Sequence, residues 1–247
     1  MTGSVHDLAR VFRDVRRAVV LTGAGVSTDS GIPDFRSRMG LWRDADPMRF
    51  ATQQGFLADP VAFYDFWREH MGRLADVKPN VTHEVLALLE RAGRVGCIVT
   101  QNIDGLHQAA GSKNVHEVHG TFRTVRCLEC GVREPSSRAF SIVGRAPRCR
   151  VCGGLLRPDV VLFGEALGGA FEDATEELVR ADLLLVLGSS LEVAPVSDLV
   201  PYAADREIPV AIVNRDATHH DDMATVVVHR ELSPTMRELA AELGLRR

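Results

Sequence analysis

Six short runs of almost uniformly apolar residues recur along this chain. They lie at Ala18–Thr22, Val95–Thr100, Val160–Phe163, Leu183–Leu187, Pro209–Val213 and Thr225–Val228. Strands buried on both faces have this continuous apolar character, and they occur mainly in parallel sheets that helices cover. Helical patterns separate most of the runs, at Val81–Arg91, Ala170–Arg180, Val196–Ala204 and Pro234–Leu243. The alternation predicts an α/β fold with a doubly wound parallel sheet.

Local signals place helices at both ends of the chain. Four apolar residues near the start recur at helical spacing: Leu8, Val11, Phe12 and Val15. They predict an amphipathic helix that precedes the first strand. In the last helix we expect Ser233 at the N-cap, Pro234 at the first helical position and Gly244 just beyond the end.

Two stretches interrupt the alternation and predict a smaller second domain. Residues 39–78 contain both tryptophans, Trp42 and Trp67, and show helical patterning over Val61–Leu74 but no strand. Residues 125–156 are rich in Arg, Pro and Gly and hold four of the five cysteines. We expect a discontinuous large domain of residues 1–38, 79–124 and 157–247. The small domain would combine a helical module (39–78) with a cysteine-bearing module (125–156).

Composition narrows the class of protein. The 247 residues are 45% hydrophobic and 25% charged, which is ordinary for a globular chain and excludes a disordered one. A net charge of −4 argues against attachment to DNA or acidic membranes by bulk electrostatics. The apolar runs are too short to span a bilayer, and the first residues lack the apolar core of a secretory signal. We therefore expect a cytoplasmic protein without a membrane partner.

The segments that follow four of the predicted strands carry glycines, small hydroxyls or amides. They are Gly23-Ala24-Gly25, Gln101-Asn102-Ile103-Asp104, Gly188-Ser189-Ser190 and Asn214-Arg215-Asp216. Open α/β sheets bind ligands at the carboxyl ends of their strands, and glycine allows the backbone to approach phosphate oxygens. Together the segments indicate a dinucleotide site. Thr28 stands where the usual fingerprint has its third glycine, which argues against an ordinary dehydrogenase.

The cysteines predict a metal site. Cys127-x-x-Cys130 and Cys149-x-x-Cys152 are separated by eighteen residues, a spacing typical of a four-thiolate zinc site. Four thiolates leave no open coordination position, so we expect one structural Zn²⁺ per chain. Cys97 lies within an apolar run and is interpreted as a core residue.

Histidine is the natural general base near neutral pH. Six of the nine lie in helical or polar surface stretches, where a structural role is favoured: His6, His70, His83, His219, His220 and His229. His119 precedes Gly120, between a short strand and the cysteine-bearing module, which favours a position in a cleft. Local sequence alone does not decide whether it acts as a base.

Several blocks together resemble the sirtuin family of NAD-dependent protein deacylases. They are the segment from Gly23 to Ser37 (GAGVSTDSGIPDFRS), the segment from Thr100 to His107 (TQNIDGLH), His119-Gly120, the four cysteines, the segment from Arg157 to Glu165 (RPDVVLFGE) and Gly188-Ser189-Ser190-Leu191. The resemblance covers nearly the whole chain, roughly Val19 to Glu231. It implies a Rossmann-like domain beside a small domain, and a deacetylase that moves the acetyl group of acetyl-lysine onto the ADP-ribose of NAD and releases nicotinamide.

The resemblance also implies roles for individual residues. His119 and Asn102 would be catalytic, with His119 as general base. The cofactor-binding set would be Gly23, Ala24, Gly25, Thr28, Asp34, Phe35, Arg36, Gln101, Asn102, Ile103, Asp104, Gly188, Ser189, Ser190, Asn214, Arg215, Asp216 and Glu231. Two edges would hold an acetylated protein lysine and its peptide as an added strand: Val161, Phe163, Gly164 and Glu165, with Leu191, Glu192 and Val193.

Three alternatives remain open at this point. The same pocket could transfer ADP-ribose to another nucleophile, or could remove other acyl groups. Sirtuins that remove succinyl groups share a Tyr-x-x-Arg pair, whereas this chain has Tyr64 followed by Trp67, with Arg68 one position later. A zinc-ribbon nucleic-acid binder would use arginines near the cysteines: Arg123, Arg126, Arg133, Arg138, Arg145, Arg148 and Arg150. A solvated surface is favoured for these, so no dedicated nucleic-acid site is expected.

Overall fold

The computed structural model describes residues 3–34, 40–43, 45–71 and 76–245. Its helices are α1 (Val5–Phe12), α2 (Pro47–Phe50), α3 (Gln53–Ala58), α4 (Pro60–Met71), α5 (Val81–Arg91), α6 (Leu106–Ala109), α7 (Ser137–Ser141), α8 (Gly169–Val179), α9 (Leu199–Ala204) and α10 (Leu232–Glu242). Its strands are β1 (Ala18–Thr22), β2 (Val95–Thr100), β3 (Val115–Glu117), β4 (Gly120–Cys127), β5 (Arg133–Pro135), β6 (Leu156–Val160), β7 (Leu183–Leu187), β8 (Val210–Val213) and β9 (Val226–Val228). Short 3-10 turns are η1 (Ala24–Val26), η2 (Thr28–Ser30), η3 (Leu41–Arg43) and η5 (Asp221–Met223).

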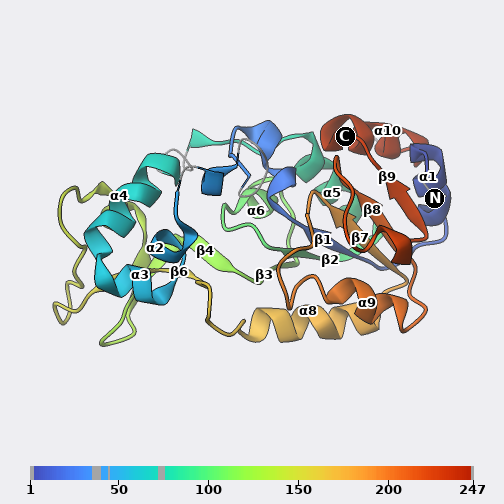
Figure 1. Cartoon of the computed structure of the whole chain (residues 1–247). Helices are drawn as coiled ribbons and strands as arrows, with labels where there is room; N and C mark the ends of the chain where they lie inside the picture. Colours follow the sequence, from blue (N-terminus) through green and yellow to red (C-terminus); the bar gives the residue numbers. More distant parts are fainter. Residues whose placement is uncertain (1–2, 35–39, 44, 72–75, 246–247) are drawn as a thin grey trace.

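The large sheet has six strands in the order β3-β2-β1-β7-β8-β9 (Figure 1). Every pairing within it is parallel. The chain runs outward from β1 through β2 to β3, and then returns to place β7 on the other side of β1. Ligands bind in open α/β sheets at the point where strand order reverses in this way. The predicted doubly wound α/β fold is confirmed, and the runs predicted near β1, β2, β7, β8 and β9 are strands.

Helices cover both faces of this sheet (Figure 1). One face packs its apolar side chains, such as Leu185, against α1, α5 and α10. The opposite face packs alternate residues, such as Leu184 and Val186, against α8 and α9. Because successive strand side chains point to opposite faces, burial on both sides requires the continuous apolar runs seen in the sequence.

The run at Val160–Phe163 was wrongly predicted as a strand of the parallel sheet. The strand there is β6, which ends at Val160 and pairs antiparallel with β4 in a separate three-stranded sheet, β5-β4-β6. Val161–Phe163 continue beyond it, with a single parallel bridge between Phe163 and Thr52. An apolar run indicates that a segment is buried, but it does not indicate which of two sheets the segment joins.

Residues 39–78 are helical where they are described, with η3, α2, α3 and α4 and no strand among those residues, as predicted. Aromatic rings hold this unit together: Phe56 and Phe63 are fully buried, and Trp67 lies edge-on to Trp42. The same apolar cluster includes Phe122 of β4 and Leu156 of β6, so the helices and the small sheet share one core. Figure 1 shows this unit at one end of the large sheet.

The last helix begins earlier than predicted. Glu231 is the N-cap of α10, and Ser233 and Pro234 lie within its first turn, so the cap assigned to Ser233 is wrong. Proline at this point is tolerated because the first backbone N–H groups of a helix lack intrahelical partners. Gly244 follows the helix end with a left-handed φ of 66°, as predicted. Among the described residues, no helix is long and apolar enough to cross a membrane.

Gly120 sits where β4 begins, directly after His119, and tolerates no side chain. Its φ is +76°, and a Cβ placed there would lie 2.1 Å from the carbonyl oxygen of Asp159 in β6. Gly144 provides a contrast, because it has a similar φ of +70° but no atom within 4 Å of the position that a Cβ would take.

We expect Gly120→Ala to lower the free energy of unfolding by about 3 kcal/mol or more, because left-handed strain of about 1–2 kcal/mol adds to a backbone clash. Gly144→Ala should lower the free energy of unfolding only by the left-handed strain, because no atom meets its Cβ. Urea denaturation of both variants measures the difference. Equal losses would show that β4 and β6 can separate at His119 without cost.

Candidate functional site

A cavity of about 650 Å³ opens at the carboxyl edge of the large sheet. The segments after β1, β2, β7 and β8 form one wall, and the chain after β6 and parts of the helical unit form another. Most predicted cofactor-binding residues line it: Gly23, Ala24, Gly25, Thr28, Asp34, Gln101, Asn102, Ile103, Gly188, Ser189, Ser190, Asn214, Arg215, Asp216 and Glu231. His119 lines it too, as do the predicted peptide residues Val161, Phe163, Gly164, Glu165, Glu192 and Val193.

Two of the predicted residues that the structure describes do not contribute to this lining. Asp104 lies outside it, and Leu191 is buried, with only 4% of its surface exposed. Phe35 and Arg36 fall outside the described residues.

The glycines after β1 and β7 bring two loops into direct contact. The Gly25 amide donates a hydrogen bond of 2.9 Å to the Gly188 carbonyl oxygen. A Cβ on Gly23 would lie 2.6 Å from that same oxygen, and a Cβ on Gly25 would lie 2.9 Å from the Gly188 Cα. Only glycine permits this approach, which leaves bare backbone at the cavity wall, as dinucleotide-binding sheets require.

Asn102 is held in a polar chain behind the cofactor loop. Its side-chain nitrogen donates to the Gly23 carbonyl and to Ser27 Oγ, both at 3.1 Å, which leaves Oδ1 as an acceptor. Ser27 Oγ in turn donates to Asp104 at 2.7 Å, and the Leu106 amide donates to the other carboxylate oxygen at 2.9 Å. Burial raises the pKa of Asp104. Asp104 therefore orients Asn102 through Ser27.

His119 has one ring nitrogen committed to the protein. Nδ1 lies 3.1 Å from the carbonyl oxygen of Gln101. Since a carbonyl oxygen only accepts, Nδ1 carries the hydrogen and Nε2 is the nitrogen that can accept a proton. Burial lowers the pKa of His119 below its usual 6.5, although the bond to Gln101 acts in the opposite direction. The ring is therefore neutral at pH 7 and able to act as a base.

Two other histidines lie beneath the first strand end. His107 is buried and its Nε2 lies 3.0 Å from Thr22 Oγ1, while its ring is 4.8 Å from that of His83. Burial lowers the pKa of His83 to about 4 and that of His107 to about 3. Both are neutral core histidines, so His83 keeps the structural role predicted for it, although in the core and not at the surface.

The segment after β8 carries polar and charged groups that contact one another in the cavity wall. Asn214 donates from Nδ2 to the Asp216 carbonyl at 2.8 Å, and Arg215 pairs with the Asp216 carboxylate at 3.3 Å. His219, predicted to be structural, also lines the cavity.

Sequence reasoning missed part of the lining: Trp42, Ala51, Phe122, Val160, Leu162, Leu167, Ala194, Pro195, Ala217, Thr218, Arg230 and Leu232. Trp67, which the acyl-group argument weighed, is among the lining residues and donates from Nε1 to the Phe50 carbonyl at 2.8 Å. Most of the missed residues are apolar, and an apolar residue in a cavity wall has the same sequence pattern as one in a core.

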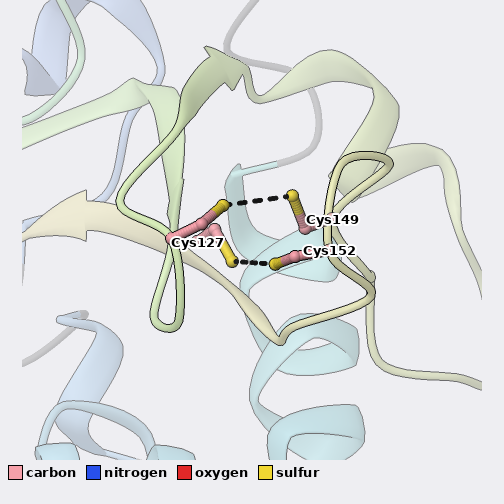
Figure 2. A group of neighbouring side chains, drawn as sticks. Cys127, Cys149 and Cys152 are labelled. Atoms are coloured by element: carbon pink, nitrogen blue, oxygen red, sulfur yellow. Dashed lines mark hydrogen bonds between the residues drawn. The ribbon is translucent and has the colours of Figure 1, made fainter.

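The four predicted zinc ligands converge. All four sulfur atoms lie within 4.8 Å of one another, with Cys127 and Cys152 at 3.5 Å and Cys130 and Cys149 at 3.8 Å. Tetrahedral Zn–S bonds of about 2.3 Å place sulfurs about 3.8 Å apart, so the cluster fits Zn²⁺. Figure 2 shows Cys127 on one side of the cluster, with Cys149 and Cys152 facing it from a single loop on the other side. Cys97 lies apart, fully buried in the large core.

Several arginines near the cysteines are paired with carboxylates. The pairs are Arg123 with Glu117, Arg126 and Arg133 with Asp159, and Arg138 with Glu134. Charges neutralised in this way are less available to phosphate groups.

Residues 23–195 match the model of the Sir2 family. The chain belongs to the Sir2 family. The match spans the glycine loops, His119, the cysteine cluster and the segment after β6.

Curated Sir2 relatives align along nearly their whole length. An NAD-dependent protein deacetylase of Geobacillus kaustophilus is 45% identical over 93% of this chain and 94% of its own. One from Caldanaerobacter subterraneus is 42% identical over 94% of this chain and 92% of its own. A solved complex of Sir2 with a p53 peptide and NAD⁺ superposes with a TM-score of 0.90, at 35% identity over 98% and 99% of the two chains.

We expect the purified protein to carry about one zinc per chain, and Cys149→Ser to lose the metal and destabilise the small unit, because metal binding there is folding free energy. Metal analysis and thermal unfolding measure both effects. Cys97→Ala is the matched control, since it removes a thiol outside the cluster and should retain zinc. Full stability of a zinc-free protein would contradict the assignment.

Proposed function

We propose that this chain is an NAD-dependent protein-lysine deacetylase that releases nicotinamide and 2′-O-acetyl-ADP-ribose. One observation carries the proposal: a single cavity is lined by bare-backbone glycine loops, by a neutral histidine and by the segment after β6. A dinucleotide, a base and a peptide would thus meet in one space. Turnover of an acetyl-lysine peptide that occurs equally with and without NAD would contradict it.

The cavity residues fit NAD. Gly23, Gly25 and Gly188 offer backbone that can approach a pyrophosphate closely, and the segment Asn214–Asp216 offers polar groups for the adenosine end. Gln101, Asn102 and Ile103 would surround nicotinamide and its ribose, with the Asn102 Oδ1 acceptor held in place through Ser27 and Asp104. When bound, NAD supplies a cationic leaving group at C1′ and the ADP-ribose that receives the acetyl group.

His119 supplies the base. Its Nδ1–H bond to Gln101 fixes the tautomer, so Nε2 takes a proton from the ribose diol when the acetyl group is transferred. Burial lowers the pKa of His119 and so favours the neutral ring before the reaction. The protein thus contributes position and one base.

The peptide would lie between Val161–Glu165 and the segment Glu192–Val193, with acetyl-lysine entering the cavity. This arrangement adds a strand whose main chain supplies affinity while the cavity selects the side chain. The helical module, the zinc module and the discontinuous large domain are proposed as the units that form the two sides. The reduced thiolates that zinc needs fit a cytoplasmic location, and the paired arginines fit the absence of a dedicated nucleic-acid site.

ADP-ribosyl transfer to another nucleophile remains the second candidate for the same cavity. That reaction needs no base on the ribose diol, whereas His119 is present and poised as one. We therefore expect His119→Ala to bind NAD almost as the wild type does, and to lose deacetylation by a factor on the order of 10² or more. Calorimetric titration with NAD and peptide turnover measure the two properties. Turnover close to that of the wild type would remove His119 from the mechanism.

Among the described residues, Tyr64 and Arg68 do not form the carboxylate-binding pair that succinyl-removing sirtuins share. Tyr64 is fully buried and donates to the Leu156 carbonyl at 3.0 Å. Arg68 points elsewhere: Nε donates to the Phe140 carbonyl at 2.8 Å, and the guanidinium pairs with Asp65. Of Tyr64, Trp67 and Arg68, Trp67 is the residue that lines the cavity.

We expect acetyl-lysine to be cleaved at least about tenfold more efficiently than succinyl-lysine, because burying an unpaired carboxylate costs more than one hydrogen bond of binding energy. The measurement is kcat/KM on one peptide with either acyl group. Arg68→Gln is the control and should leave the ratio unchanged. An equal succinyl rate in the wild type, lost in Arg68→Gln, would show that Arg68 reaches the acyl group.

A further inference from the structure

Six consecutive residues, Val160 to Glu165, line the cavity. Most of them have a backbone group that is hydrogen-bonded to another part of the protein or of the segment. The Val161 amide donates to the His119 carbonyl at 2.9 Å, and the Phe163 amide donates to the Ala51 carbonyl at 2.7 Å. The Leu162 amide between them donates to the Glu165 carboxylate at 2.9 Å. The Leu162 amide is therefore held by a side chain, whereas the Val161 and Phe163 amides are held by backbone carbonyls.

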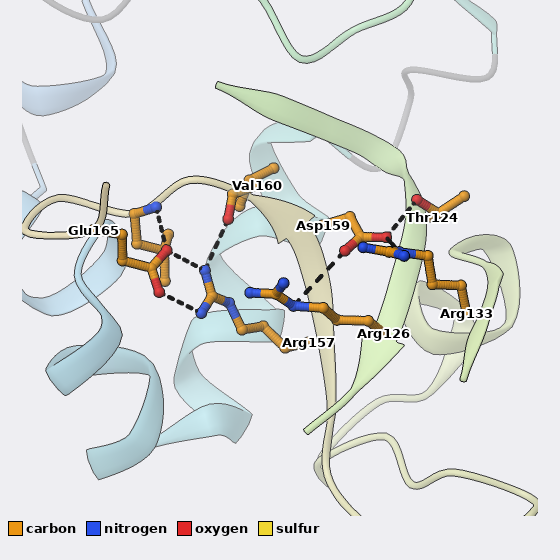
Figure 3. Close-up of polar contacts among 8 residues, drawn as sticks. Thr124, Arg126, Arg133, Arg157, Asp159, Val160 and Glu165 are labelled. Atoms are coloured by element: carbon orange, nitrogen blue, oxygen red, sulfur yellow. Dashed lines mark hydrogen bonds and ion pairs between the residues drawn. The ribbon is translucent and has the colours of Figure 1, made fainter. Parts of the chain in front are cut away.

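That side chain is itself held by a buried arginine (Figure 3). Arg157 of β6 is 1% exposed, and Nη1 donates to Glu165 Oε1 at 2.6 Å while Nη2 donates to the other carboxylate oxygen. The same Nη2 also donates to the Val160 carbonyl at 2.8 Å. Arg157 thus contacts both ends of the cavity-lining segment, and the Glu165 carboxylate accepts a hydrogen bond from Leu162 in the middle of the segment.

The negative charge of Glu165 is paired with a positive charge within the protein. Burial alone would raise the pKa of this carboxyl, but the hydrogen bonds from Arg157 and Leu162, with the charge of Arg157, lower it. A carboxylate already gripped by a planar guanidinium fork has little capacity left for a substrate cation. Its position in the cavity wall therefore does not make it a contact for basic residues of the peptide.

We propose that Arg157 and Glu165 are positioning residues that set the shape of the peptide-binding edge, and hence the affinity for acetyl-lysine peptide but not for NAD. Arg157 acts only through Glu165 and Val160, because its own side chain is not part of the cavity wall. The segment it shapes carries Val161, Phe163 and Gly164, whereas the glycine loops after β1 and β7 have their own contacts. The inference rests on the proposed deacetylase function.

The same strand offers a matched control (Figure 3). Asp159, two residues after Arg157, accepts hydrogen bonds from Thr124 Oγ1 at 3.0 Å and from Arg133 Nε at 2.9 Å. These bonds tie β6 to β4 and β5, and Asp159 does not line the cavity. A change there removes a carboxylate from β6 while leaving the cavity wall anchored.

The experiment compares Glu165→Gln, Glu165→Asp and Asp159→Asn in the full chain, with KM measured separately for an acetyl-lysine peptide and for NAD. Glu165→Gln removes the charge that Arg157 faces, so the segment should shift and peptide KM should rise at least about tenfold, with NAD KM within about twofold of the wild type. Glu165→Asp keeps the charge but shortens the reach, and should raise peptide KM by a smaller factor. Asp159→Asn should leave both constants unchanged.

Zinc content and thermal unfolding of each variant distinguish misfolding from a displacement of the Val160–Glu165 segment in a folded protein. If Glu165→Gln fails to fold, the charge-retaining Glu165→Asp decides, and an unchanged peptide KM in that variant overturns the proposal. Equal increases in peptide and NAD KM, or the same increase in Asp159→Asn, would also overturn it by indicating general loosening. A wild type that does not deacetylate the peptide would instead contradict the proposed function and not the role of Arg157.

Discussion

The contact between the backbone after β1 and the backbone after β7 is the constraint on which the site depends. These strands are neighbours only because the chain returns across the sheet after β3, and their ends meet through the Gly25 amide and the Gly188 carbonyl at 2.9 Å. Side chains at Gly23, Gly25 or Gly188 would force the loops apart. With the loops in contact, Gly23 also accepts a hydrogen bond from Asn102, which couples the end of β2 to the same point.

The second wall of the cavity comes from parts of the chain that have no place in the large sheet. His119 lies directly before β4 of the small sheet, the Val160–Glu165 segment lies at the end of β6, and the helical unit supplies Trp67. A shared aromatic core joins these pieces, and the cysteine cluster closes the far end of the small sheet. Four thiolates would saturate Zn²⁺, so the metal would stabilise this wall and take no part in chemistry.

Sequence patterns predicted the elements whose environment is uniform along their length. Strands such as β7 are buried on both faces, so their whole length is apolar. The two Cys-x-x-Cys pairs predict a four-thiolate cluster from spacing alone. Val161–Phe163 were misassigned because an apolar run leaving one sheet to line a cavity has the pattern of a buried strand. Ser233 was misassigned because α10 begins where packing places Leu232 in the core. The Arg157–Glu165 pair joins a strand to the loop that follows it, and only the fold shows that this loop faces the cavity.

The proposed deacetylation is tested most directly by the product balance of a single reaction with acetyl-lysine peptide and NAD, followed by mass spectrometry. If NAD, the base and the peptide share this cavity as described, each freed lysine is accompanied by equal amounts of nicotinamide and acetyl-ADP-ribose. Nicotinamide released without acetyl-ADP-ribose, or ADP-ribose attached to the peptide, would contradict the proposed deacetylation and indicate that another nucleophile reaches C1′.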